Sequence, residues 1–172
     1  MGSYDIGKDE ISMWIRLNFP KGSTCLDVGA CDGKWHSLLG DWLVMDAVEI
    51  YRPNIERNRL HDRYRTVYGM DINNFGYDWY DLIIFGDVIE HMDEYHALHV
   101  LSYAWNRCRD MVVAVPYGYE QDELYGNPWE KHLQPDLTPE VFDERYPGFR
   151  RLYYSWFFQY AYYVKGKSKG GR

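Results

Sequence analysis

The sequence has few cysteines and no long hydrophobic run. Its 172 residues contain 3 cysteines, and the uneven spacing of Cys25, Cys31 and Cys108 does not let all of them pair within one molecule. A membrane span needs about 20 consecutive apolar residues, whereas the longest apolar stretches here are as short as Met111 to Pro116. The first residues also lack the basic and then apolar layout of a secretion signal. These absences predict a protein of the reducing cytoplasm with no membrane segment.

Positive charge is scarce as well. The chain has 19 Lys and Arg against 26 Asp and Glu, which gives a net charge of −7. Several of the basic residues lie in 165–172, so the rest of the chain is more acidic still. Binding of nucleic acid by counterion release needs a basic face, and no predicted element gathers Lys and Arg into one. We therefore expect that nucleic acid is not a partner.

The composition is that of one globular domain. The chain is 46% hydrophobic, and a domain of this length hides roughly 70% of the surface that its unfolded chain exposes. No internal repeat or linker interrupts it. We expect residues 1–172 to form a single domain, with an N-terminal helix in 1–21, a core over 22–164, a lid-like loop over 117–137 and a flexible basic tail over 165–172.

Helix-like and strand-like patterns alternate along the chain. Residues 8–18 place apolar side chains at helical spacing, and Tyr80 to Phe85 form the continuous apolar run of a strand covered on both faces. Such alternation predicts an α/β fold with a doubly wound, mostly parallel seven-stranded sheet, helices on both faces and a C-terminal antiparallel strand pair. The expected strands are 24–28, 43–50, 65–68, 80–85, 111–115 and two within 149–164; the expected helices are 8–18, 34–41, 53–60, 94–107 and one that begins at Thr138-Pro139.

A glycine turn follows the first predicted strand. Residues 27–33 read DVGACDG, so Gly29 and Gly33 lie where a strand gives way to a helix and where backbone can approach a ligand closely. Glu49 lies about twenty residues further on, at the end of the next strand, where an acid can accept hydrogen bonds from both hydroxyls of a ribose. The turn and the acid together predict a nucleoside site.

The charges around this turn indicate which nucleoside it binds. Dinucleotide sites use GxGxxG so that a pyrophosphate can rest on the helix N-terminus, but Cys31 replaces the middle glycine here. Asp27 and Asp32 would repel a pyrophosphate and attract a ligand that carries an ammonium and a sulfonium. That description suits S-adenosylmethionine and disfavours a nicotinamide oxidoreductase.

Over about residues 22–165 the sequence resembles the class I S-adenosylmethionine-dependent methyltransferases. Their first motif, an acid followed by spaced glycines, matches at Asp27, Gly29 and Gly33 and departs at Cys31. The resemblance implies that the neighbours of Gly29 contact the methionine part of the cofactor. It also implies a methyltransferase activity with S-adenosylmethionine as the cofactor.

Three later segments extend the resemblance. Residues 70–72 (MDI) resemble the family's acid near the adenine, residues 80–92 (YDLIIFGDVIEHM) its fourth strand and following loop, and residues 112–118 (VVAVPYG) its fifth strand. The resemblance implies that Glu49 holds the ribose and that Asp71 contacts the adenine amine. The cofactor-binding residues expected in full are Asp27, Gly29, Ala30, Cys31, Gly33, Glu49, Ile50, Asp71, Ile72, Gly86 and Asp87.

The leading functional hypothesis is methyl transfer to an oxygen or nitrogen of a small-molecule acceptor. Alignment of the acceptor supplies much of such a rate, and a general base adds to it when the acceptor must lose a proton. His91, after the fourth strand, is the first choice for this base or for a group that orients the acceptor, and His132 in the loop is the second. The alternative for His91 is a structural role beneath the site.

The same residues allow a second interpretation. Small-RNA 2′-O-methyltransferases of this fold carry a similar Glu-x-x-Glu-His stretch and a later His that hold a divalent metal. Asp87, Glu90, His91 and His132 could form such a set, but the acidic body argues against RNA, and we predict no metal. A cofactor-binding module without turnover is a further alternative. The aromatic segment 156–158 is expected in the core or in a homodimer contact.

Overall fold

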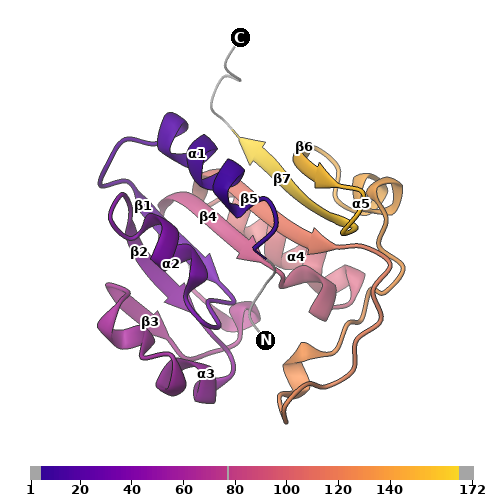
Figure 1. Cartoon of the computed structure of the whole chain (residues 1–172), viewed down its shortest axis with the longest axis horizontal. Coiled ribbons are helices and arrows are strands. Elements are labelled where there is room, and N and C mark those ends of the chain that lie inside the picture. The colour runs from indigo at the N-terminus through magenta and orange to yellow at the C-terminus, as the bar shows by residue number, and fades with distance from the viewer. Residues whose placement is uncertain (1–4, 77, 167–172) are drawn as a thin grey trace.

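A computed structural model describes residues 5–76 and 78–166. Seven strands form one sheet in the order β3-β2-β1-β4-β5-β7-β6 (Figure 1). Strands β1 to β5 are parallel to one another, and β7 runs antiparallel to both of its neighbours. The predicted sheet, with its C-terminal antiparallel pair, is confirmed. The strands are β1 (Thr24–Val28), β2 (Val44–Val48), β3 (Thr66–Tyr68), β4 (Tyr80–Gly86), β5 (Cys108–Pro116), β6 (Arg150–Ser155) and β7 (Tyr160–Gly166).

Helices cover both faces of this sheet, as expected (Figure 1). Helices α1, α2 and α3 contribute Ile15, Trp35 and Ile55 to one apolar layer, while α4 and α5 contribute Val100 and Phe142 to the other. The two layers meet opposite faces of the same strands. The helices are α1 (Lys8–Asn18), α2 (Lys34–Leu39), α3 (Arg52–Arg57), α4 (Glu94–Trp105) and α5 (Pro139–Arg145).

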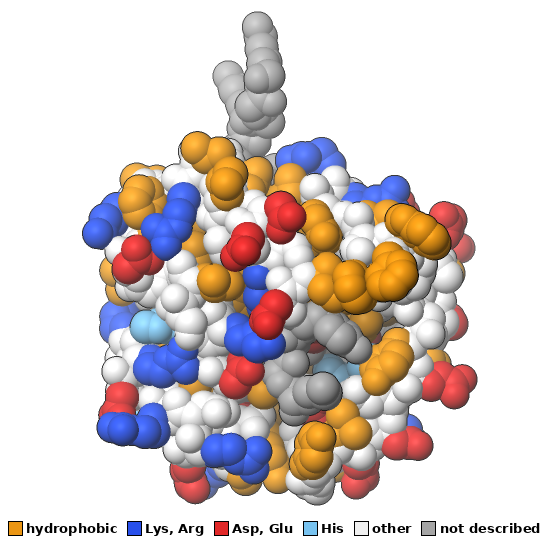
Figure 2. All heavy atoms as spheres, viewed as in Figure 1, with side chains coloured by type: hydrophobic (Ala, Val, Ile, Leu, Met, Phe, Trp, Pro, Cys, Tyr) orange, Lys and Arg blue, Asp and Glu red, His pale blue; other side chains and the backbone are white. Residues whose placement is uncertain are grey.

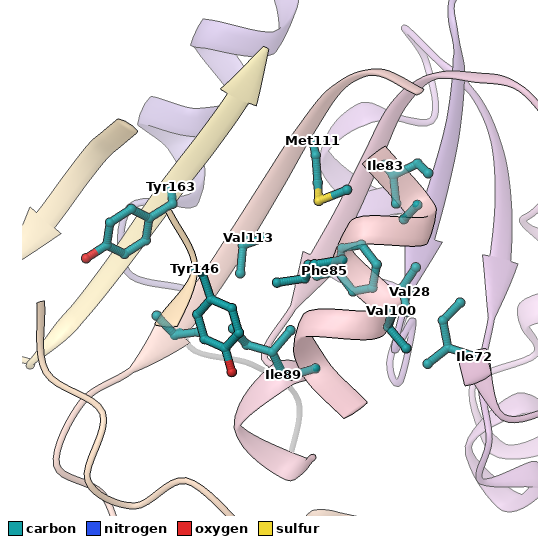
Figure 3. Packing of buried hydrophobic residues seen from close by; sticks show 14 of the residues in the cluster. Val28, Ile72, Ile83, Phe85, Ile89, Val100, Met111, Val113, Tyr146 and Tyr163 are labelled. Atoms are coloured by element: carbon teal, nitrogen blue, oxygen red, sulfur yellow. The ribbon is translucent and has the colours of Figure 1, made fainter. Parts of the chain in front are cut away.

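The central strands are buried on both faces, which explains their continuous apolar sequence. Figure 3 shows the layer beneath α4, where Phe85 of β4 and Val113 of β5 pack near Val100. Alternate residues of β4, Leu82 and Ile84, lie in the opposite layer. Burial of apolar surface stabilises the fold by roughly 25 cal/mol per Å², so these strands are the most strongly stabilised part of the sheet. The loops at its carboxyl edge therefore start from fixed positions.

The ends of the predicted elements differ from the observed ends for local reasons. Thr138 caps α5 as predicted, because its side-chain oxygen accepts a hydrogen bond from the Val141 N–H. The helix expected over 53–60 ends at Arg57, because Arg59 takes a left-handed backbone with φ 51° and a separate turn of 3₁₀ helix follows. The strand expected over 43–50 stops at Val48.

Two expectations concern the surface of the molecule. The aromatic residues expected in the core or a dimer contact, Trp156, Phe157 and Phe158, are 74%, 74% and 56% exposed, so the core is excluded and the dimer contact stays a prediction. Strand β7 includes the first two residues of the predicted basic tail, and 167–172 lie outside the described residues. Acidic and basic side chains mix across the face shown in Figure 2. Among the described residues, no helix is long and apolar enough to cross a bilayer.

Candidate functional site

A cavity of about 700 Å³ opens at the carboxyl edge of the parallel strands. Parallel strands end at one edge, so residues that follow β1, β2, β3 and β4 meet there although they are far apart in the sequence. Of the residues predicted to bind the cofactor, those that line the cavity are Gly29, Ala30, Cys31, Glu49, Ile50, Asp71, Ile72, Gly86 and Asp87. The two predicted catalytic residues, His91 and His132, line it as well.

The turn after β1 lies close to the loop after β4. Gly29 has a positive φ of 73°, and a Cβ atom on it would lie 2.5 Å from Cγ2 of Val88. A side chain at this position would therefore face both a strained backbone and a collision. Cys31, which replaces the glycine of the family motif, also has a positive φ of 45°. The turn thus keeps a glycine-like conformation at Cys31, although the residue is not glycine.

Glu49 joins the loops that follow β1 and β2. Its Oε2 accepts a hydrogen bond of 2.8 Å from the Cys31 N–H, and its Oε1 accepts one of 2.8 Å from the Tyr51 N–H. Only 4% of Glu49 is exposed, and this burial raises its pKa above the ordinary value, while the two backbone donors act in the opposite direction. Each carboxylate oxygen keeps acceptor capacity for a ligand in the cavity.

Two residues that donate hydrogen bonds to the glycine turn were not predicted from the sequence, because neither belongs to a recognised motif. Asn58 donates to the Cys31 carbonyl at 2.8 Å, and the Arg63 guanidinium donates to the carbonyls of Asp32 at 2.8 Å and Gly33 at 2.6 Å. These carbonyls belong to a turn that bends sharply into α2, so they have no strand partner. No local pattern in the sequence distinguishes Asn58 and Arg63 from surface polar residues.

Asp27 and Gly33 do not line the cavity. The Asp27 side chain is 1% exposed and lies beneath the turn, where the Tyr64 hydroxyl donates a hydrogen bond of 2.5 Å to it. Burial raises the pKa of Asp27 to about 7, against the effect of the Tyr64 hydrogen bond. The backbone of Gly33 contacts Arg63 instead of the cavity. These two residues support the turn from below.

The buried Asp27 carboxyl makes stability depend on pH. Its pKa is raised from 3.8 when unfolded to about 7 when folded, so the folded state keeps a proton that the unfolded state releases, and stability falls as the pH rises through this window. We expect Asp27→Asn to remove this fall and to make the protein about 1–3 kcal/mol more stable at pH 8, since the neutral amide loses only part of the Tyr64 hydrogen bond.

Urea unfolding at pH 4.5 and pH 8 tests this expectation. The difference in the free energy of unfolding between Asp27→Asn and the wild type is expected to grow with pH across that range. Parallel pH profiles for the two proteins would contradict the raised pKa of Asp27.

The loop after β3 supplies another wall of the cavity. Asp71 begins a turn of 3₁₀ helix, and its Oδ1 accepts hydrogen bonds of 2.9 Å from both the backbone and the side-chain amide of Asn73. Ile72 is buried behind it. Oδ1 is thus held in place by Asn73, which fixes the carboxylate at the cavity wall. Asn73, which also lines the cavity, was not predicted.

The end of β4 brings further predicted residues to the cavity. Gly86 packs so closely on the indole of Trp35 that a Cβ atom would lie 2.8 Å from Nε1. Asp87 adopts a left-handed backbone with φ 56°, and its Oδ1 accepts a hydrogen bond of 2.5 Å from the Tyr160 hydroxyl. Strained non-glycine residues of this kind concentrate at functional sites. Tyr160, in the aromatic C-terminal segment, had no functional signal in the sequence.

Glu90, His91 and His132 meet at the cavity next to the end of β4. One ligand-type atom from each of them lies within 4.8 Å of the other two, and the imidazole rings are 4.8 Å apart between centroids. Burial and the neighbouring His132 lower the pKa of His91 to about 4, and burial lowers that of His132. Both rings are therefore neutral at pH 7. The Glu90 carboxyl is 1% exposed, and burial together with Asp87 raises its pKa.

The loop over 117–137 lines the cavity with residues such as Tyr119 and Trp129. It is attached to the 3₁₀ turn that follows β4, because the N–H groups of Leu133 and Gln134 donate to the Glu90 carbonyl at 2.8 and 3.2 Å. Near its tip the Gly126 carbonyl accepts a hydrogen bond of 3.5 Å from the Tyr51 hydroxyl on the opposite rim. That this segment acts as a lid, as expected from the sequence, stays a prediction. We call residues 117–137 the lid below.

The cavity is strongly acidic. In the described part of the chain, eight carboxyl side chains and one lysine, Lys34, line it, and Lys34 pairs with Asp5 at 2.9 Å. An acidic cleft of low dielectric attracts cationic ligands and disfavours phosphates. The carboxyl residues are Asp5, Asp32, Glu49, Asp71, Asp87, Glu90, Asp93 and Glu130.

Comparison with known proteins gives a match in structure and none in sequence. No family model and no curated protein matches the chain. An S-adenosylmethionine-dependent methyltransferase from Clostridium acetobutylicum has a TM-score of 0.69 at 12% identity, over 92% of this chain and 90% of its own. Magnesium protoporphyrin IX methyltransferase from Synechocystis with bound SAM has a TM-score of 0.63 at 15% identity, over 92% and 77%.

A third solved structure is similar over nearly its whole length. The N-methyltransferase NodS from Bradyrhizobium japonicum has a TM-score of 0.62 at 13% identity, over 95% of this chain and 98% of its own. The strand order and the antiparallel β7 agree with the expectation from the sequence motifs. The chain therefore has the fold of the class I S-adenosylmethionine-dependent methyltransferases.

Proposed function

We propose that the protein transfers a methyl group from S-adenosylmethionine to an oxygen or nitrogen of a small molecule. The observation that carries this proposal is the acidic cavity at the carboxyl edge of the sheet. The turn at Gly29 and the side chain of Glu49 both line this cavity. A sulfonium and an ammonium are favoured in such a cavity, whereas the pyrophosphate of a dinucleotide is repelled.

The cavity has one half suited to each reactant. In this proposal Glu49 accepts from the ribose hydroxyls and Asp71 from the adenine amine, which is supported by the presence of both carboxylates in the cavity lining. His91 and His132 also line the cavity, and we assign the acceptor to their side of it. When bound, S-adenosylmethionine supplies a methyl group activated by positive sulfur. The chain aligns the acceptor on the far side of that methyl group, and such alignment is worth up to about 7–11 kcal/mol.

Calorimetry separates this proposal from its alternatives. S-adenosylmethionine and its demethylated product are expected to bind with micromolar affinity or better, and NAD is expected not to bind. Binding of NAD in preference to the other two would overturn the proposal. Release of the demethylated product in the presence of an acceptor distinguishes an enzyme from a module that only binds the cofactor.

His91 is proposed to contact the acceptor. We expect His91→Asn to lower the turnover number by about 10²-fold, the usual contribution of a positioned acid–base group, because the asparagine amide cannot replace the imidazole lone pair. Affinity for the demethylated cofactor is expected to change less than about threefold, or less than about 0.7 kcal/mol. Single-turnover kinetics and calorimetry on the same variant measure the two quantities separately.

His99 on α4 provides the matched control, because it is exposed and does not line the cavity. His99→Asn is expected to keep both turnover and affinity. Full activity of His91→Asn would show that His91 does not act on the acceptor. Its role would then be structural, which is the alternative given in the sequence analysis.

Metal-assisted methylation of RNA ribose is the second candidate. It requires His91 and His132 to converge, and their rings are in contact. The acidic cavity and the net charge of −7 disfavour a polyanion. Competition of a short unlabelled RNA against acceptor turnover tests it, and inhibition at micromolar RNA would favour this candidate over a small molecule.

A further inference from the structure

The lid carries aromatic side chains that line the cavity and are open to solvent. Tyr119, Tyr125 and Trp129 all belong to the cavity lining, and they are 43%, 79% and 52% exposed. Single exposed aromatic residues are ordinary, but several around one opening indicate a surface that a ligand covers. The Tyr119 ring lies 5.4 Å from the imidazole of His132 between centroids, so this aromatic surface is on the side that we assign to the acceptor.

A turn of 3₁₀ helix (Pro128–Glu130) holds one of these rings next to a carboxylate. Asn127, which is 5% exposed, closes the turn with its side chain. Its Oδ1 accepts a hydrogen bond of 3.1 Å from the Trp129 N–H, and its Nδ2 donates one of 3.1 Å to Oε1 of Glu130. Side-chain bonds of this kind fix a turn locally. Trp129 and Glu130 are therefore presented together at the cavity wall.

The charge at this turn suits a cationic ligand. The next residue, Lys131, does not line the cavity and pairs with Asp122 at 3.5 Å. Burial is the main cause of the raised pKa of Glu49 and of Glu90, and the charge of Glu130 adds to the rise at both residues. A carboxylate beside an indole ring can bind an organic ammonium by ion pairing and by cation–π attraction.

Glu90 gives a second indication of a positively charged ligand. It lines the cavity, only 1% of it is exposed, and neither carboxyl oxygen has a hydrogen-bond partner among the described residues. A buried carboxyl group without a partner is costly, and a cation in the adjoining cavity lowers that cost. In the described part of the chain the cavity lining contains one lysine, Lys34, which pairs with Asp5. Additional positive charge therefore has to come from what binds there.

We infer that the lid binds an organic cation, in which an aromatic ring stacks on Trp129 and a protonated amine pairs with Glu130. The identification of this cation as the methyl acceptor rests on the proposed function, whereas its binding does not. A protonated nitrogen has no lone pair with which to attack a methyl group. The atom that is methylated is therefore a second, uncharged oxygen or nitrogen of the same molecule.

Three phenols that differ in the charge of their side chain test this inference. Tyramine is a cation at pH 7, tyrosol is neutral, and 4-hydroxyphenylacetate is an anion. Calorimetry on the cofactor-free protein, repeated with demethylated cofactor present, is expected to show tyramine binding at least about tenfold more tightly than tyrosol. The anion is expected not to bind. Equal affinity for tyramine and tyrosol, or no binding of tyramine in either state, overturns the inference.

Substitutions in the turn assign the two contacts. Glu130→Gln keeps an oxygen for Asn127 and removes the charge, so tyramine is expected to bind at least about fivefold more weakly while tyrosol changes less than about twofold. Trp129→Ala is expected to weaken both ligands. Glu123→Gln and Trp156→Ala are the matched controls, because both residues are exposed and do not line the cavity. Equal losses in Glu123→Gln and Glu130→Gln would contradict the assigned ion pair.

A separate titration with demethylated cofactor keeps this inference apart from the proposed function. Binding of tyramine without binding of the cofactor product would overturn the proposed function and support the cation site. Binding of the cofactor product without binding of tyramine would overturn the cation site and leave the proposed function standing.

Discussion

Replacement of Gly29 by alanine is expected to weaken binding of demethylated cofactor at least about a hundredfold, or 2.7 kcal/mol. The new Cβ atom would lie 2.5 Å from Cγ2 of Val88, so either Val88 changes its rotamer in the cavity wall or the turn after β1 and the loop after β4 separate. Both line the cavity. The positive φ of 73° adds a cost of about 1–2 kcal/mol to the free energy of folding.

Gly22 is a matched control because it isolates the backbone effect. Its φ is 89°, and nothing lies within 4 Å of a Cβ atom placed on it. In urea unfolding, Gly22→Ala is expected to lower the free energy of unfolding about as much as Gly29→Ala does. It is expected to bind the demethylated cofactor with wild-type affinity. Wild-type affinity of Gly29→Ala in calorimetry would show that the ligand does not approach this turn, and the proposed cofactor position would be wrong.

Loss of the Glu49 carboxylate is expected to weaken binding of the same ligand by about 2–3 kcal/mol, or about 30- to 150-fold. Glu49→Ala removes the two acceptors that we propose for the ribose. It also releases the N–H groups of Cys31 and Tyr51, which shape the loops on both sides of the ribose position. The thermal midpoint is therefore expected to fall as well, and calorimetry is performed below it.

Two further variants test the cause of this loss. Glu49→Gln keeps one oxygen but places an amide NH₂ against one backbone donor, so we expect an affinity between those of the wild type and Glu49→Ala. Glu56→Ala removes an exposed acid from α3 and is expected to have no effect. If Glu49→Ala loses stability and keeps its affinity, Glu49 is only a structural link between the loops.

The sheet, and the meeting of the glycine turn and Glu49 at one cavity, were predictable because short, local patterns determine them. The run from Tyr80 to Phe85 can only be a strand buried on two faces, and glycines after a strand indicate a turn where backbone approaches a ligand. Glu49 follows the next strand, so the parallel topology alone brings it to the same edge as Gly29. Local sequence and topology together were sufficient for these residues.

The supporting residues were not predictable, because they act through contacts between distant segments. Tyr64 donates to Asp27 from 37 positions away, and Arg63 reaches the turn at Gly33 from 30 positions away. Asp27 was expected at the ligand, but its place in β1 faces it toward Tyr64. The tautomers of His91 and His132 depend on the carbonyls of Lys131 and Tyr119, which only the path of the lid determines.

The origin of His132 makes one contact of the site depend on the path of a loop. Glu90 and His91 belong to the 3₁₀ turn that follows β4, whereas His132 belongs to the segment 117–137. Any displacement of that segment would also take His132 away from these two residues. The contact between the rings of His91 and His132 is therefore made only while the segment keeps the path described above.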